Sequence, residues 1–230
     1  KNIVDPNIII NKYGADTARL FMVSDSPPER DLEWSEDGIK ATYKYLNKIF
    51  LFLDTNFSFI SSDKFICNKH DSDDEDTIRN VNLTIFNFTE DIKNYRFNSA
   101  IARLRELSNN LFFRKNLSLD CKNYSWSIFL RLIYLITPHF SDELATSGGY
   151  KGTLTSLKWP EADLSYLEVN SKKIVIQLNG KKRGIIETPI NSDQSFVVEM
   201  IKSNEKYDFL DGLEIKKIIF VKNKIINYVV

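Results

Sequence analysis

The chain has 230 residues, of which 43% are hydrophobic, with 16 Phe and 10 Tyr. This length and apolar content suffice for one large or two modest folded domains and exclude disorder of the whole chain. Lys plus Arg and Asp plus Glu balance at 31 each, so the chain as a whole lacks the basic surplus of a typical nucleic-acid binder.

The two cysteines, Cys67 and Cys121, are far apart, and neither has a CxxC partner or a histidine at ligand spacing. The sequence therefore predicts free thiols, with no zinc site and no disulfide framework. No segment reaches the ~18 consecutive apolar residues that span a bilayer. We expect a cytoplasmic protein without a membrane partner.

The first 34 residues predict two short helices. Asp5 can cap a helix that has Pro6 at its first position, and Gly14 is placed to end it. The second helix runs from Asp16 to Ser24 and stops before Pro27-Pro28, because neither proline can donate a backbone hydrogen bond.

A longer helix is expected from Ser35, with one apolar stripe made by Ile39, Tyr43, Leu46, Phe50 and Leu53. The polar stretch from Ser61 to Asp76 then predicts a solvated loop, whose carboxylates favour the N-terminus of the next helix. Because a calcium-loop pattern with its central glycine is absent, these carboxylates do not predict a metal site.

Two more helices follow this loop. The first has a four-and-three repeat, which fits a coiled coil or, more commonly at this length, one face of an antiparallel bundle. Its apolar residues are Ile78, Val81, Ile85, Phe88, Ile92 and Tyr95. The second helix, capped by Asn98, turns leucines and Ile101 inward and leaves Arg103, Arg105, Arg114 and Lys115 outside.

A last helix is expected over residues 124–144, kinked or restarted at Pro138. His139 is more readily explained as a hydrogen-bonded core imidazole than as a catalytic group. The sequence shows no nucleophile paired with a base, no glycine-rich phosphate loop and no paired carboxylates in an apolar stretch. We therefore expect no catalytic residues in this chain.

After Gly148-Gly149 and a connecting segment, the apolar period changes from 3.6 to 2. Asn179-Gly180 between two such runs is the strongest short hairpin signal. Asp193 then caps a helix, and two strands, 214–221 and 224–230, close the chain. The order ββαββ predicts a small α+β domain.

Residues 168–230 hold 11 basic and 8 acidic residues, which leaves 20 and 23 for residues 1–167. Cations on a hairpin and a turn can bind phosphates by shape, or they can simply discourage strand pairing at a sheet edge. Charge alone does not decide between these two roles. The candidate tRNA-binding residues are Lys172, Lys173, Lys181, Lys182, Arg183, Lys216, Lys217, Lys222 and Lys224.

Several motifs carry a resemblance to the class I aminoacyl-tRNA synthetases. YGADTARLF at 13–21 and DLEWSEDGI at 31–39 resemble the segment after the active-site signature loop of these enzymes. FNSAIARLRELSNN at 97–110 and TPHFSDEL at 137–144 are similar to two helices of the anticodon-binding domain shared by the leucine, isoleucine, valine and methionine enzymes. The residues after TPHFSDEL depart from the family, which usually ends this motif in Trp.

The C-terminal part most resembles the bacterial-type leucyl-tRNA synthetases within this class. IVIQLNGKKRG at 174–184 and KKIIFVKNKIINYVV at 216–230 carry that resemblance, which covers the chain nearly end to end. It implies that the first residues follow a Lys-Met-Ser-Lys-Ser loop, and that the nucleotide-binding and editing domains lie upstream. Leucine enzymes generally do not read the anticodon.

The resemblance implies a mainly α fold, with a helical bundle followed by a small α+β domain. The implied parts are a stem-contact segment (1–34), a helical tRNA-binding domain (35–147), a linker (148–170) and a small tRNA-binding domain (171–230). The parent would be a ligase that uses ATP and Mg²⁺ to join leucine to tRNA, whereas this chain holds tRNA and needs no cofactor. The alternatives are a non-enzymatic RNA-binding or assembly module, or the same part of a valine, isoleucine or methionine enzyme.

Overall fold

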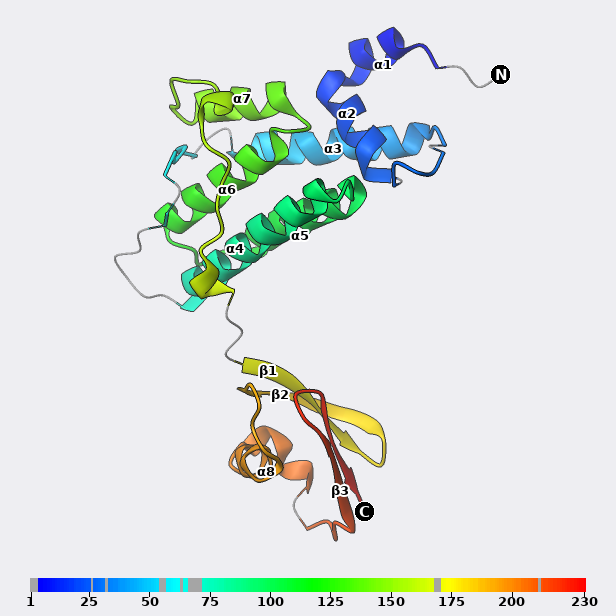
Figure 1. The fold of residues 1–230 in the computed structure, drawn as a ribbon, viewed down its shortest axis with the longest axis vertical. Coiled ribbons are helices and arrows are strands. Elements are labelled where there is room, and N and C mark those ends of the chain that lie inside the picture. The colour runs from blue at the N-terminus through cyan, green and yellow to red at the C-terminus, as the bar shows by residue number, and fades with distance from the viewer. Residues whose placement is uncertain are drawn as a thin grey trace. The chain divides into compact units, whose positions relative to one another are not determined.

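The computed structural model describes residues 4–25, 27–31, 33–53, 57–62, 64–65, 72–167, 171–210 and 212–230. Two compact units make up the chain, residues 1–167 and 168–230. The first unit is helical, and the second contains a four-stranded sheet with a helix (Figure 1). This confirms the predicted fold class. The prediction for Cys67 falls outside the described residues.

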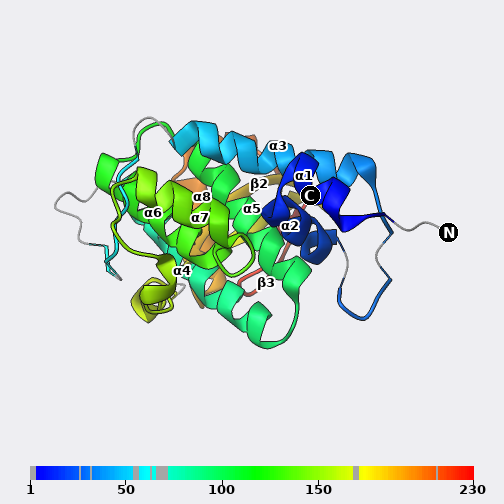
Figure 2. The same ribbon diagram turned by 90° about the horizontal axis from the view of Figure 1, so that it is seen from above.

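The helical unit begins with the two short helices that capping rules predict. In α1 (Pro6–Tyr13), the Asp5 side chain accepts a hydrogen bond from the Asn7 N–H at 2.9 Å, and Gly14 ends the helix with φ of 84°. The next helix, α2 (Ala15–Asp25), ends before the two prolines. Both helices lie at the end of the unit where α3 (Glu36–Leu53) begins (Figure 2).

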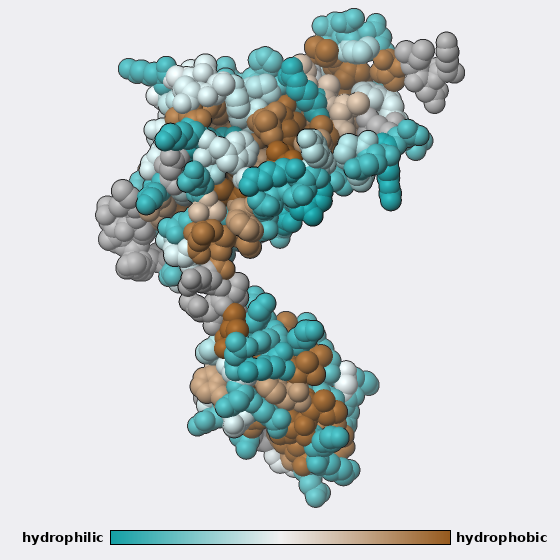
Figure 3. All heavy atoms as spheres, viewed as in Figure 1, coloured by the Kyte–Doolittle hydropathy of each residue, from teal (hydrophilic) through white to brown (hydrophobic). Residues whose placement is uncertain are grey.

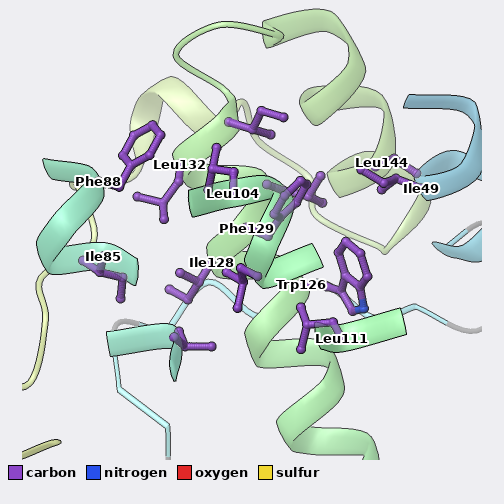
Figure 4. Close-up of a cluster of buried hydrophobic side chains, with 14 of the residues drawn as sticks. Ile49, Ile85, Phe88, Leu104, Leu111, Trp126, Ile128, Phe129, Leu132 and Leu144 are labelled. Atoms are coloured by element: carbon purple, nitrogen blue, oxygen red, sulfur yellow. The ribbon is translucent and has the colours of Figure 1, made fainter. Parts of the chain in front are cut away.

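Five helices form the core of this unit. After α3 come α4 (Ser72–Lys93), α5 (Phe97–Phe113), α6 (Leu119–Ile133) and α7 (Pro138–Ser147). Side chains from all five point toward one another, with Trp126 of α6 fully buried among them (Figure 4). Two short 3₁₀ turns, Leu154–Ser156 and Leu164–Tyr166, follow α7.

The apolar stripe of α3 differs from the predicted one. Thr42 and Ile49 are buried, whereas Tyr43 is 38% exposed and Phe50 is only half-buried. Thr42 can take a core position because its hydroxyl donates to the Gly38 carbonyl at 3.0 Å. The prediction for Tyr95 was also wrong, because this residue lies beyond the end of α4 with φ of 59° and is 69% exposed.

Several acidic residues that were expected in a solvated loop lie in helix α4 instead. Helix α4 begins at Ser72, so the described part of the acidic run forms its first turn. Asp74 is 2% exposed and accepts a hydrogen bond from the Ser118 N–H at 3.0 Å. Asp91, also buried, binds Arg96 and Arg103, so Arg103 is not the free outer cation that the sequence predicts.

Helix α5 begins one residue before the predicted cap. Its N-cap residue is Arg96, and Asn98 lies inside the helix. The reason is that Arg96 binds the end of α4. The Arg96 N–H donates to the Asp91 carbonyl at 2.8 Å, and the Arg96 guanidinium contacts the Asp91 carboxylate at 2.9 Å. This pair fixes where the chain turns into α5.

Pro138 begins a new helix, and His139 is not a core residue. The His139 side chain is 76% exposed, with Nδ1 at 3.2 Å from Asp16 Oδ1. Asp16, 8% exposed, also accepts from Arg19 Nη1 at 2.7 Å and from the Phe140 N–H at 2.7 Å. A carboxylate of α2 therefore caps the first turn of α7, which joins two motifs more than 120 residues apart.

The second unit has the predicted order of elements. Strands β1 (Ser171–Leu178) and β2 (Lys181–Pro189) form a hairpin, followed by α8 (Gln194–Lys202), the 3₁₀ segment Glu205–Leu210, β3 (Lys217–Val221) and β4 (Ile225–Val229). The sheet order is β2-β1-β4-β3, with β1 and β4 parallel and both outer pairs antiparallel. Val197 and Ile201 of α8 pack on one face of this sheet, among Ile174, Ile176, Ile186, Tyr207, Ile226 and Tyr228.

A capping residue explains where α8 begins, and a glycine explains how β2 packs against Tyr207. The Asp193 carboxylate accepts from the Phe196 N–H at 2.8 Å, and this bond, with one from the Ser195 hydroxyl, holds the pKa of Asp193 below its ordinary value. Gly184 faces the Tyr207 ring, which would lie 2.6 Å from an added Cβ. The small residue therefore lets Tyr207 close the core, with its hydroxyl donating to the Ile185 carbonyl at 2.6 Å.

Candidate nucleic-acid interface

The β1–β2 hairpin holds its basic residues on a well-anchored turn. Asn179 and Gly180 have φ of 48° and 78°, the left-handed values that a type I′ turn needs. The Asn179 N–H donates to the Tyr228 carbonyl at 2.8 Å, and the Gly180 N–H donates to Asn227 Oδ1 at 2.9 Å. The turn is therefore tied to β4, and Lys181 follows it directly.

A β-bulge directs two of these cations to the same face. Ile176 pairs with Gly184, but the next residue, Gln177, pairs with Lys182, which leaves Arg183 without an opposite residue. Gly184 faces Tyr207, on the side of the sheet that α8 covers, so alternation places Arg183 on the other face, and pairing with Gln177 places Lys182 there as well. We call this other face, which α8 does not cover, the open face.

The structure separates the remaining basic residues. Lys173, directly across from Glu187, and Lys217, directly across from Val229, lie on the open face. Lys172 and Lys216 alternate to the α8 side, so the structure does not bring them together with the other cations. All nine predicted residues are exposed.

Lys222 and Lys224 flank the β3–β4 turn at Asn223, whose φ is 61°. The Asn191 N–H donates to Asn223 Oδ1 at 2.9 Å, which holds this turn against the loop before α8. Because Ile225 pairs with Val175 and Tyr228 with Leu178, the two turns lie beyond opposite ends of the β1–β4 ladder, which is itself about 10 Å long. On the open face itself, Lys182, Arg183 and Lys217 lie toward the hairpin end, and Lys173 lies toward the other end.

An apolar strip, which sequence reasoning missed, lies between these two ends. Ile185, Ile219 and Val221 are 41%, 43% and 47% exposed, beside the half-buried Val175 and Ile225. Hydrophobic and hydrophilic side chains lie next to one another on the surface of this unit (Figure 3). The available signal was the run IIFV at 218–221, which is apolar on both faces of the strand although only one face is covered.

This arrangement suits an anionic, partly unstacked polymer better than a small molecule. Exposed cations at both ends can contact phosphates, and the strip between them can contact unstacked bases or sugars. In the described part of the chain no three His, Cys, Asp or Glu side chains gather as metal ligands. None of the described helices is long and apolar enough to cross a membrane.

The arginines of the helical unit are mostly engaged within it. Arg114 donates to the Asp73 carbonyl at 3.1 Å, and Arg131 donates to the Lys158 carbonyl at 2.6 Å. The sequence places four cations on the outside here, Arg103, Arg105, Arg114 and Lys115. Because Arg103 binds Asp91 and Arg114 binds Asp73, Arg105 and Lys115 remain from these four. The helical unit therefore offers fewer free cations than its sequence indicates.

Comparison with known proteins gives whole-chain matches. A leucine–tRNA ligase of Prochlorococcus marinus (strain NATL1A) is 34% identical over 232 residues, and one of Orientia tsutsugamushi (strain Boryong) is 37% identical over 240 residues. Both alignments cover 100% of this chain and 27% of the relative, so the chain spans about a quarter of their length.

A solved ternary complex of the Agrobacterium radiobacter K84 LeuRS with tRNA and LeuAMS has a similar fold, with a TM-score of 0.76. The LeuRS chain in that complex is 23% identical to this chain. The match covers 99% of this chain and 30% of the LeuRS chain. The family model described as the anticodon-binding domain of tRNA ligase matches residues 74–200, more than half of the chain. The chain therefore belongs to the anticodon-binding domain family of tRNA ligases.

Proposed function

We propose that this chain is the tRNA-holding part of a leucine–tRNA ligase. The observation that carries the proposal is the unbroken similarity to leucine–tRNA ligases over both units. The whole enzyme would activate leucine with ATP and Mg²⁺ and attach it to a leucine-accepting tRNA. The family model alone fits ligases for other amino acids, and the relatives favour leucine among them.

The proposed division of labour follows the predicted parts. Residues 1–34 contact an upstream catalytic domain of the same chain, and residues 35–147 lie along the tRNA. Residues 148–170 link this domain to the small domain, 171–230, which contacts tRNA phosphates. The catalytic and editing sites belong to other parts of the enzyme, which acts in the cytoplasm.

Within the small domain, the proposed tRNA-binding residues are the nine basic residues named from the sequence. The open face supports an order among them: Lys182, Arg183 and Lys217 lie together with the apolar strip, whereas Lys172 and Lys216 lie on the α8 side. We expect the hairpin cations to contribute most, because the anchored turn restricts how far they can move away from a bound phosphate.

The chain should bind a leucine-accepting tRNA but should not activate leucine. We expect its affinity for a tRNA(Leu) transcript, measured by fluorescence anisotropy, to fall with salt with a log–log slope of about −0.7 to −0.9 per neutralised phosphate. Leucine-dependent pyrophosphate exchange should stay at background. Exchange above background, or no tRNA binding at low salt, would contradict the proposal.

A further inference from the structure

A second candidate site lies in the helical unit, in a cleft between α2, α3 and α5. Its volume is about 260 Å³, and its polar lining comes from Ser24, Asp25, Thr42, Asn98 and Arg105. This is smaller than the ~300–1,000 Å³ of pockets for drug-sized ligands, so it can hold one small group of a larger molecule.

Arg105 is the unusual member of this lining. Its guanidinium lies over the Tyr45 ring, 5.1 Å from the centroid, and its Nε is buried with no hydrogen-bond partner in the structure. By contrast, Arg96 and Arg103 both bind a carboxylate. A buried donor without an acceptor is costly unless a ligand supplies one.

The stacking partner of Arg105 cannot be that acceptor. The Tyr45 hydroxyl is 2.9 Å from the Ser108 hydroxyl, and burial raises the pKa of Tyr45 to about 12. The phenol therefore stays neutral near pH 7, and it holds the guanidinium in place without cancelling its charge. An external anion would complete the site.

The other side chains of the lining restrict the ligand further. Thr42 and Ser24 already donate their hydroxyl hydrogens to backbone carbonyls, so they can only accept. Asn98 brings the N-terminal turn of α5 to the cleft, and this end of a helix also favours an anion. The ligand should thus combine an anionic oxygen for Arg105 with a hydroxyl donor for the acceptors.

An RNA backbone carries both groups in every nucleotide, a phosphate and a ribose 2′-hydroxyl. We propose that this cleft receives one ribose–phosphate unit of RNA, with Arg105 on the phosphate and Ser24 Oγ accepting from the 2′-hydroxyl. This inference rests on the proposed tRNA binding, and it adds a defined contact in the helical unit.

The test measures binding of the 230-residue chain to a tRNA(Leu) transcript at several salt concentrations. Arg105→Gln should weaken binding about five- to eightfold at 0.1 M salt and flatten the salt slope by about 0.7 to 0.9. Ser24→Ala, which removes the acceptor, should also weaken binding, although by less than Arg105→Gln does. Arg105→Lys, which keeps the charge but not the planar fork, should fall between wild type and Arg105→Gln.

Lys115→Gln removes one exposed charge outside the cleft and should change binding less than Arg105→Gln does. Far-UV circular dichroism shows whether each variant is folded. Wild-type affinity and slope in folded Arg105→Gln, or wild-type affinity in folded Ser24→Ala, would overturn the inference while leaving the proposed function intact. Failure of the wild-type chain to bind tRNA would instead overturn both.

Discussion

Replacing Lys182 and Arg183 together by glutamine should weaken tRNA(Leu) binding about 25- to 60-fold at 0.1 M salt. The bulge places both cations on the open face, and the loss of two phosphate contacts should flatten the log–log salt slope by about 1.4 to 1.8. Fluorescence anisotropy titrations between 0.05 and ~0.2 M salt measure both quantities.

A matched control removes two positive charges from the same unit at Lys202 and Lys206, which are exposed but lie outside the hairpin. This double variant should keep most of the wild-type affinity and slope. If both double variants lost affinity equally, the effect would come from net charge alone, and the open face would have no special role.

The Trp126→Ala substitution should cost the helical unit about 3–5 kcal/mol in free energy of unfolding. Trp126 is fully buried, and its ring centroid lies 5.2 Å from that of Phe129 and 5.3 Å from that of Phe112. This loss is a large part of the ~5–15 kcal/mol that stabilises a typical domain. Urea unfolding followed by circular dichroism at 222 nm checks it.

Trp159→Ala provides the comparison, because Trp159 is 39% exposed, stacks on Phe88 and donates to the Thr89 hydroxyl at 2.8 Å. It should cost less than half as much as Trp126→Ala. Equal losses would mean that burial in this core does not set the stability of the unit.

The features that the sequence predicted well depend on neighbouring residues. Asp5, Asp193 and Asn179-Gly180 act within three residues of their own position, so capping and turn rules identify them. Pro138 likewise marks the start of α7 because it fixes its own backbone.

The features that the sequence missed depend on distant partners. His139 contacts Asp16, 123 residues away, and Arg103 contacts Asp91 of the preceding helix, 12 residues away. Asn82 is buried because its side-chain oxygen accepts from the Asp163 N–H at 2.7 Å, 81 residues away. Helical periodicity treats such polar residues as surface, so it cannot find them.

The candidate interface shows the same division. Composition identified the basic residues and the hairpin, but not which face each cation occupies, because one bulge at Lys182 and Arg183 changes the alternation. The exposed strip of Ile185, Ile219 and Val221 required the structure to show that α8 covers only the other face. The role of these residues in tRNA binding stays a proposal.

Hydroxyl-radical footprinting of the chain, with and without a tRNA(Leu) transcript, tests the central claim most directly. The account predicts that bound tRNA protects Ile185 and Val221 on the open face from oxidation, and leaves Phe196, which is 44% exposed on α8, unchanged. Protection of Phe196 with unchanged oxidation of Ile185 and Val221 would contradict it.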